Sequence, residues 1–323
     1  MNINSTTIRT LSMLGQRGAF GTALTELAAK NEKIVALSAD LCNTAGLDRF
    51  QKAYPDRLIN VGIAEQNMIG VAAGIADSGY VAFAATFANF AALRACEQVR
   101  HFLGYMQCNV KLIGFGAGYA MEFFGNTHYG IEDIAALRAI DNLIILSPSD
   151  GLSVVKCVEA AAQINAPIYI RLTGGMNTPI IYKEDFDFSI GKAVELKSGK
   201  EVAIFASGRV VSNAVEAAKI LEKESISAAV FDLHTIKPLD TQTIVNISTE
   251  KKLIVSVEEH SVFGGVGSAI AETLSSHSNT PPLLRLGIDR YRKAGDYEYM
   301  IERAGLKSEQ IANAIKQKLK EKR

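Results

Sequence analysis

The stretch that organises this chain reads Val61-Gly62-Ile63-Ala64-Glu65-Gln66-Asn67-Met68. Glu65 is a single acidic residue between the apolar run before it and the small-residue run at 69–76. This pattern predicts a buried helix that begins near Glu65 and points its carboxylate inward. A helix-start carboxylate that only meets the local helix dipole is the ordinary interpretation. The apolar strand expected before it and the aromatic-rich segment at 86–90 favour a functional carboxylate instead.

Length and composition indicate an ordinary globular protein with two domains. The chain has 323 residues, of which 48% are hydrophobic and 21% are charged, and this length exceeds what one core usually supports. The 34 Lys and Arg residues balance the 34 Asp and Glu residues. We therefore expect no nucleic-acid partner and no membrane partner, and we expect small-molecule chemistry.

Cysteine usage and hydropathy predict a cytoplasmic protein. The four cysteines have no CxxC spacing and lie in apolar or small-residue surroundings, as reduced thiols do. Residues 1–12 lack the pattern of a signal peptide, and no apolar run reaches the ~18 residues that a membrane helix needs. We expect neither a signal peptide nor a membrane span.

Strands and helices are predicted to alternate along most of the chain, as in a parallel α/β sheet. The Ser-, Thr- and Asn-rich residues 1–16 are expected to form a flexible lead-in. A first domain is expected over 17–175, a linker over 176–189 and a second α/β domain over 190–323. Expected strands are 34–37, 58–61, 80–85, 110–115, 143–146, 168–172, 202–205, 228–232, 253–257 and 283–286.

The Glu65 stretch resembles the pyrimidine-binding domain of thiamine-diphosphate enzymes, and in particular the C-terminal half of transketolase. The resemblance extends over almost the whole chain and rests on separated motifs at 38–41, 125–133, 232–240 and 257–261. It implies an α/β fold of two domains, each with a mainly parallel sheet flanked by helices. The first is then a pyrimidine-binding domain and the second a transketolase C-terminal domain.

The resemblance also implies which residues contact the cofactor. Glu65 matches the glutamate that hydrogen-bonds ring nitrogen N1′ of the aminopyrimidine and favours the imino tautomer, which removes the proton from thiazolium C2. Phe87 and Phe90 match the aromatic positions around that ring, and Phe90 is the expected stacking partner. Asp40 follows a strand where α/β sheets place ligands, although it is equally suited to capping a turn.

Further positions resemble the substrate-binding residues of transketolases. His128 matches the histidine that reaches oxygen atoms of the donor and of the cofactor-bound intermediate, a task that suits imidazole. Arg17, Thr44 and Arg171 match positions that bind the phosphate of a sugar phosphate, since a guanidinium can hold two phosphate oxygens at once. Arg17 is equally consistent with a surface residue at a helix start.

Two positions depart from the transketolase pattern. Phe124 replaces the acidic residue that most transketolases carry four positions before the loop histidine, and we count it among the substrate-binding residues. Gly116 stands where those enzymes often place another phosphate-binding histidine. Both changes predict a substrate site that is less polar than a pentose phosphate requires.

A motif that this cofactor normally requires is missing. Thiamine-diphosphate enzymes hold the diphosphate and Mg²⁺ through a Gly-Asp-Gly motif, and this chain contains none. Mg²⁺ prefers oxygen ligands, so we expect an N-terminal transketolase subunit to supply them. This chain is then expected to provide no metal ligand, and the active complex is expected to be an α2β2 heterotetramer with the site at the subunit interface.

The leading hypothesis is the C-terminal subunit of a split transketolase, which moves a two-carbon ketol unit from a ketose or ketose phosphate to an aldose. One alternative is a thiamine-diphosphate enzyme that uses a 2-oxo acid, either an E1 β subunit or a decarboxylating acyl or ketol transferase. Phe124 favours that alternative. A non-catalytic assembly subunit is the alternative from another class, and the retention of Glu65, Phe90 and His128 argues against it.

Overall fold

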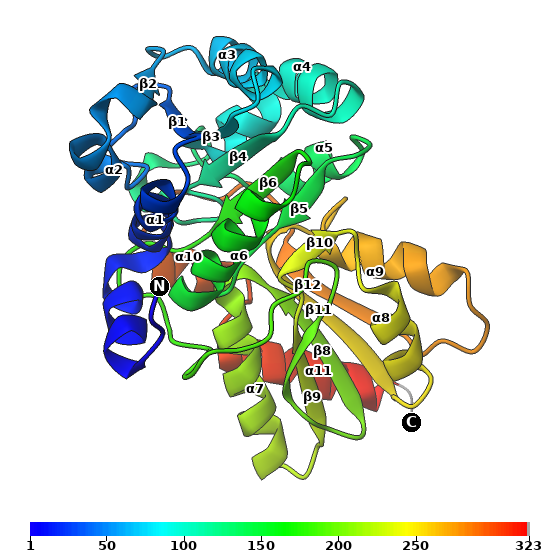
Figure 1. Cartoon of the computed structure of the whole chain (residues 1–323). Coiled ribbons are helices and arrows are strands. Elements are labelled where there is room, and N and C mark those ends of the chain that lie inside the picture. The colour runs from blue at the N-terminus through cyan, green and yellow to red at the C-terminus, as the bar shows by residue number, and fades with distance from the viewer. Residues whose placement is uncertain (322–323) are drawn as a thin grey trace.

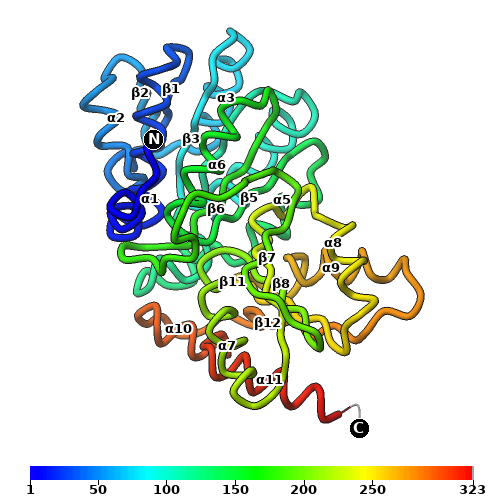
Figure 2. Tube along the Cα trace, turned by 60° about the horizontal axis from the view of Figure 1, so that its bottom comes forward, coloured from blue at the N-terminus to red at the C-terminus, as the bar shows by residue number. Residues whose placement is uncertain are grey.

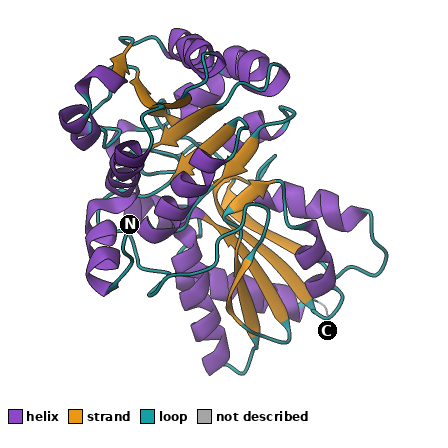
Figure 3. Cartoon of the chain, viewed as in Figure 1, coloured by secondary structure: helices purple, strands orange, loops and turns teal. Residues whose placement is uncertain are grey.

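The structure, a computed structural model, describes residues 1–321 as two α/β units, each with a sheet between layers of helices (Figure 1, Figure 3). This confirms the predicted fold class. Residues 322 and 323 of the expected second domain lie outside the described residues. Within 1–321, no helix combines the length and apolar content needed to cross a membrane.

The first sheet has seven strands in the order β10-β5-β6-β4-β3-β1-β2. Five neighbouring pairs run parallel, and the sixth pair, β10 with β5, is antiparallel. Their central members are almost wholly buried because helices cover both faces, which explains their continuous apolar sequences. The strands are β1 (Ile34–Ser38), β2 (Leu58–Asn60), β3 (Val81–Phe87), β4 (Val110–Phe115), β5 (Ile144–Leu146), β6 (Ile168–Leu172) and β10 (Thr235–Lys237).

Helices pack on both faces of this sheet (Figure 1). One face is covered by α1 (Ser5–Lys30) and α6 (Gly151–Gln163), with α2 (Asp48–Ala53) beside α1. The other face carries α3 (Glu65–Asp77), the π-helical turns η2 (Phe90–Arg94) and η3 (Val99–Tyr105) with α4 (Cys96–Gln98) between them, and α5 (Asp133–Arg138). Short 3-10 turns form η1 (Pro55–Arg57) and η4 (Glu122–Phe124).

Strand register gathers the predicted site residues at one edge of the sheet. Ser38 of β1 pairs with Asn60 of β2 and with Ala85 of β3, and Phe87 of β3 pairs with Phe115 of β4. The loops after these four parallel strands therefore leave at the same carboxyl edge. Open α/β sheets bind ligands at that edge.

The second sheet has five strands in the order β12-β11-β8-β9-β7, with β7 antiparallel to β9. In Figure 2, α7 and α11 lie together below this sheet, while α8 and α9 lie at its other side. Sequence patterns missed β7, β10, α10 and α11. The elements are β7 (Val194–Lys197), β8 (Val202–Ser207), η5 (Gly208–Val210), α7 (Val211–Lys223), β9 (Ala228–Asp232), α8 (Thr241–Ser248), β11 (Leu253–Ser261), α9 (Val266–Ser275), β12 (Leu283–Ile288), α10 (Tyr297–Arg303) and α11 (Ser308–Lys320).

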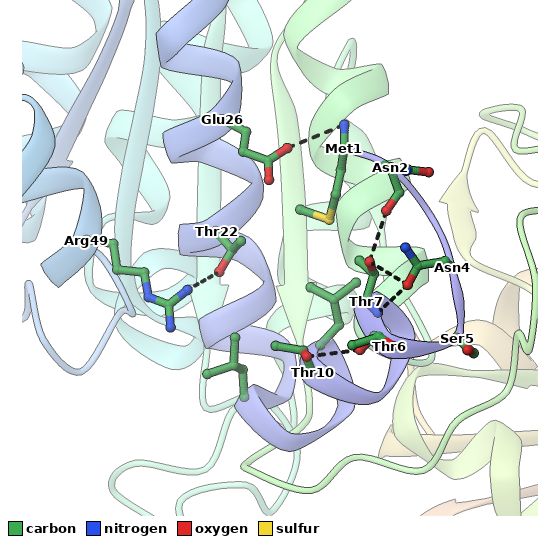
Figure 4. A pocket seen from close by; sticks show the side chains of 12 residues that line it. Met1, Asn2, Asn4, Ser5, Thr6, Thr7, Thr10, Thr22, Glu26 and Arg49 are labelled. Atoms are coloured by element: carbon green, nitrogen blue, oxygen red, sulfur yellow. Dashed lines mark hydrogen bonds and ion pairs between the residues drawn. The ribbon is translucent and has the colours of Figure 1, made fainter.

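The prediction of a flexible lead-in at residues 1–16 is wrong. The Asn4 side chain caps α1 by accepting a hydrogen bond from the Thr7 backbone N–H at 3.0 Å (Figure 4). Leu11, further along the same helix, is buried. Ser, Thr and Asn are favoured at helix N-caps, so the composition that suggested disorder marks a helix start. None of the residues that line the pocket in Figure 4 is a predicted site residue.

A glycine kink joins the two parts of α1. Gly15 has a φ of 71° inside the helix, and a Cβ there would lie 1.8 Å from the carbonyl oxygen of Gly175. The segment 173–193, which contains the expected linker, has no helix or strand and returns along this kink (Figure 3). Only glycine tolerates both the left-handed backbone and this close approach.

Candidate active site

Glu65 is the first helical residue of α3, as predicted, and its side chain is 2% exposed. Its Oε1 accepts a hydrogen bond from Nη1 of Arg94 at 2.8 Å. The neighbouring Gln66 side chain donates to the Arg94 carbonyl at 3.1 Å. The first turn of α3 therefore holds Arg94 by both its backbone and its guanidinium.

Arg94 also covers an aromatic ring. Its guanidinium carbon lies 3.8 Å from the centroid of the Phe90 ring, four residues earlier in η2. This distance is that of a cation–π contact. We assigned no role to Arg94 from the sequence, although its i,i+4 spacing from Phe90 was the available signal. π-Helical turns of this kind are frequent at functional sites.

The predicted aromatic and imidazole residues form one cluster. The rings of Phe87 and Phe90 meet edge-on at 5.5 Å and 88°, and each centroid lies 5.5 Å from that of His128. Phe124 meets the same imidazole at 5.3 Å. Phe87 is buried at the end of β3, whereas Phe124 is 64% exposed on η4. The structure thus brings these four residues together with Glu65, through Arg94.

Local hydrogen bonds hold the loop that carries His128. Asn89 donates from Nδ2 to the Thr127 carbonyl at 2.7 Å, and the Thr127 hydroxyl lies 3.0 Å from Nδ1 of His128. Because Thr127 engages Nδ1, Nε2 is the ring nitrogen available to another group. Sequence reasoning did not identify Asn89 or Thr127.

The glycine at position 116 is required by the local packing. Gly116 has a φ of 68°, and a Cβ there would lie 2.7 Å from Sδ of Met121 and 3.2 Å from Cδ1 of Phe87. A histidine side chain has no room in this arrangement. The packing behind Phe87 therefore explains why glycine, and not the histidine of other transketolases, stands at this position.

Arg17 and Thr44 form a second, smaller group. Arg17 donates from Nη1 to the Thr44 carbonyl oxygen at 2.9 Å, and burial lowers the pKa of this arginine. Within residues 1–321, neither side chain shares a hydrogen bond, ion pair or ring contact with the Glu65 cluster. Their assignment to a substrate phosphate stays a prediction.

The structure contradicts the phosphate-binding role that we predicted for Arg171. This side chain is buried, and its Nε donates to Oδ2 of Asp133 at 2.8 Å. Its Nη2 donates to the carbonyl oxygens of Gly130 and Glu259, both at 2.9 Å. Burial alone would lower the pKa of Arg171, but the Asp133 carboxylate outweighs it and the pKa is raised. Arg171 therefore ties the first domain to β11 of the second.

Asp40 organises the loop beside Glu65. It has a φ of 60°, and its Oδ1 accepts a hydrogen bond from Nδ2 of Asn60 at 3.0 Å. The Asn60 side-chain oxygen in turn accepts from the backbone N–H groups of Asp40 and Gly62, both at 3.0 Å. This is the turn-forming role that the sequence left open, and direct contact with a cofactor stays a prediction.

Comparison with known proteins identifies the class of the chain. Residues 12–177 match the pyrimidine-binding domain of transketolase, and residues 191–311 match the transketolase C-terminal domain. The fold is therefore a pyrimidine-binding α/β domain followed by the C-terminal domain of the same enzymes. The chain belongs to the transketolase family and corresponds to its C-terminal half, as predicted.

Relatives match almost the whole length of the chain. A protein from Methanocaldococcus jannaschii, provisionally assigned as a transketolase C-terminal section, is 38% identical over 95% of this chain and 96% of its own length. The 6-deoxy-6-sulfo-D-fructose transketolase subunit of a Clostridium species is 37% identical over 92% of each chain. A solved structure described as a split-gene transketolase in an inactive β4 tetramer is 39% identical, with a TM-score of 0.86 over 96% of this chain and 99% of that chain.

Proposed function

We propose that this chain is the C-terminal subunit of a split, thiamine-diphosphate-dependent transketolase. Together with an N-terminal partner subunit, it transfers a two-carbon ketol unit from a ketose or ketose phosphate to an aldose. The observation that carries this proposal is the buried Glu65 carboxylate at the carboxyl edge of the first sheet, adjoining the rings of Phe90 and His128 through Arg94. Family membership supplies the reaction class.

The residues at this site fit the aminopyrimidine of thiamine diphosphate. Glu65 offers a buried carboxylate to a ring nitrogen, and Phe90 offers an aromatic face to a flat ring. The site already accommodates a flat group with N–H donors, the Arg94 guanidinium. When bound, thiamine diphosphate supplies the carbanion that accepts the two-carbon unit.

The side chains of this subunit then have separate tasks. Glu65 shares a proton with the ring nitrogen, and its burial strengthens that interaction. His128 holds or moves a proton at a substrate oxygen through Nε2, since Thr127 engages Nδ1. Asp40 borders the cofactor through the loop before Glu65, and Arg17 with Thr44 faces the substrate phosphate.

The diphosphate and Mg²⁺ are assigned to the N-terminal subunit. Within residues 1–321, no three His, Cys, Asp or Glu side chains gather as metal ligands, and the sequence lacks Gly-Asp-Gly. Ile63 and Leu93, which lie next to site residues in the sequence, are 77% and 51% exposed, and Phe124 of the site itself is 64% exposed. Apolar groups exposed in this way favour a surface that a partner covers. The proposed assembly is α2β2.

Phe124 supports a second candidate function. The centroid of this apolar ring lies 5.3 Å from that of the His128 imidazole, at a position where most transketolases carry an acidic residue. A substrate with fewer hydroxyl groups, such as a 2-oxo acid, would match that surface better than a pentose phosphate. The name of the sulfofructose transketolase relative supports a ketose donor instead.

Reconstitution with the N-terminal subunit separates these two functions. We expect the complex to consume a ketose phosphate only when an aldose acceptor is present, and to release no carbon dioxide from pyruvate. Either subunit alone should give no product, because each lacks part of the cofactor site. Consumption of pyruvate with carbon dioxide release, and no ketol transfer, would replace the transketolase assignment.

Phe90→Ala should weaken binding of thiamine diphosphate to the complex. An aromatic pair contributes roughly 0.5–1.5 kcal/mol beyond area burial, so the dissociation constant should rise about two- to tenfold. Calorimetry in the presence of Mg²⁺ measures it, with the exposed Phe263→Ala of the second domain as control. If the wild-type complex bound no cofactor at all, a non-catalytic assembly role would be the better conclusion.

A further inference from the structure

Arg94 engages both groups that we assign to the aminopyrimidine. Its Nη1 donates to the Glu65 carboxylate at 2.8 Å, and its guanidinium lies over the Phe90 face at 3.8 Å from the ring centroid. A guanidinium and an aminopyrimidine share the relevant chemistry, since each is flat and each presents N–H groups to an acceptor. Arg94 thus contacts the same carboxylate and the same aromatic ring that we assign to the recognition of the cofactor.

We propose that Arg94 is a built-in competitor of thiamine diphosphate, which closes the aminopyrimidine site in the unloaded subunit and turns outward when cofactor binds. The inference rests on the proposed function. Arg94 occupies Oε1 of Glu65 and lies over the Phe90 ring, so an aminopyrimidine that takes the same oxygen and the same ring face has to displace the guanidinium. Cofactor binding therefore replaces the contacts of Arg94 with Glu65 and Phe90 by similar contacts of the aminopyrimidine.

The surroundings of Arg94 permit this outward turn. Its side chain is 46% exposed, whereas that of Glu65 is 2% exposed, so the arginine can reach solvent while the carboxylate stays in place. The Gln66 side chain bonds the Arg94 backbone, so this bond persists when the guanidinium leaves Glu65 and Phe90. The next acidic residue along the helical segment, Glu97, is already paired with Arg100 at 3.1 Å.

The exchange has a consequence for assembly. A site whose competent state is only partly populated binds its ligand more weakly in proportion to that fraction. Because Arg94 replaces much of what the aminopyrimidine would gain here, cofactor binding needs the diphosphate and metal contacts of the partner subunit. Loading of the cofactor is thereby coupled to assembly of the complex.

Cofactor titration of the reconstituted complex tests the inference. We expect Arg94→Ala to tighten binding of thiamine diphosphate with Mg²⁺ by about tenfold, the effect of a competent state populated to about one-tenth in the wild type. Arg94→Lys keeps a cation for the buried Glu65 carboxylate but loses the planar guanidinium over Phe90, and it should tighten binding by about threefold. The control is Arg100→Ala, an exposed arginine with its own ion pair one turn further on, which should change nothing.

The outcomes distinguish this inference from the proposed function. If the Arg94→Ala complex binds the cofactor as tightly as the wild-type complex or more weakly, the competitor role is overturned and the proposed function stays intact. If thermal unfolding shows that Arg94→Ala does not fold, Arg94→Lys takes its place: tighter cofactor binding supports the competitor role, and equal or weaker binding overturns it. Absence of saturable binding in every complex, the Arg94 variants included, overturns both.

Discussion

Glu65→Gln should lower the turnover of the reconstituted complex by about 10²–10⁴-fold, the usual contribution of a positioned proton-transfer group. Glutamine keeps the size of the side chain and an oxygen acceptor for Arg94, but it cannot take up or release the proton that a ring nitrogen exchanges. Cofactor affinity should change far less, since the Phe90 face and the contacts of the partner subunit remain. Steady-state rates at saturating cofactor, together with calorimetry, separate the two effects.

Glu97→Gln is the matched control for that experiment. Glu97 is also a glutamate paired with an arginine on the same side of the first domain, but its side chain is 59% exposed. Its loss should leave turnover unchanged, because exposed ion pairs contribute little. Near-normal turnover of Glu65→Gln at saturating cofactor would show that Glu65 is not the proton-transfer group, and this cluster would then not be the active site.

The architecture could be predicted because buried parallel strands have a strong sequence signal. The expected 110–115, 168–172 and 228–232 segments coincide with β4, β6 and β9. The missed strands β7 and β10 are the antiparallel edge strands of the two sheets, three or four residues long. Length alone does not explain the misses, since β2 and β5 are equally short and were expected. The β7 sequence Val-Glu-Leu-Lys lacks a continuous apolar run, and β10 is a second-domain strand that joins the sheet of the first.

The site could be predicted only where local sequence carries the signal. Glu65, Phe90 and His128 lie in motifs whose neighbours define them, and the structure gathers them. Arg94 and Arg171 are different, because their meaning depends on partners 29 and 38 positions away. An arginine that pairs with a buried carboxylate and an arginine that binds a phosphate have the same local sequence signal. The two roles are distinguished only by which distant residues the arginine contacts.

Arg171→Met should destabilise the subunit by about 3–5 kcal/mol, the usual effect of removing one partner from a buried ion pair. The change leaves Asp133 with a buried carboxylate. Within residues 1–321, the hydroxyl of Tyr169 at 2.7 Å remains as its side-chain hydrogen-bond donor, and Nε2 of His260 lies 3.9 Å from Oδ1. It also removes the Arg171 donor from the carbonyl groups of Gly130 and Glu259, although the Gly118 backbone N–H still donates to Gly130 at 2.7 Å. Urea unfolding of the subunit measures the loss, and Arg100→Met, which breaks an exposed pair, should cost less than about 1 kcal/mol.

The double variant Arg171→Met, Asp133→Asn distinguishes an ion-pair role from a substrate role. Neutralising Asp133 removes the unpaired charge, while the asparagine oxygen can still accept from Tyr169, so the double variant should recover part of the stability lost in Arg171→Met. Contacting residues of this kind commonly show coupling of 0.5–3 kcal/mol. If Arg171 bound a substrate phosphate instead, Arg171→Met would raise the KM for a ketose phosphate with unfolding unchanged, and Asp133→Asn would restore nothing.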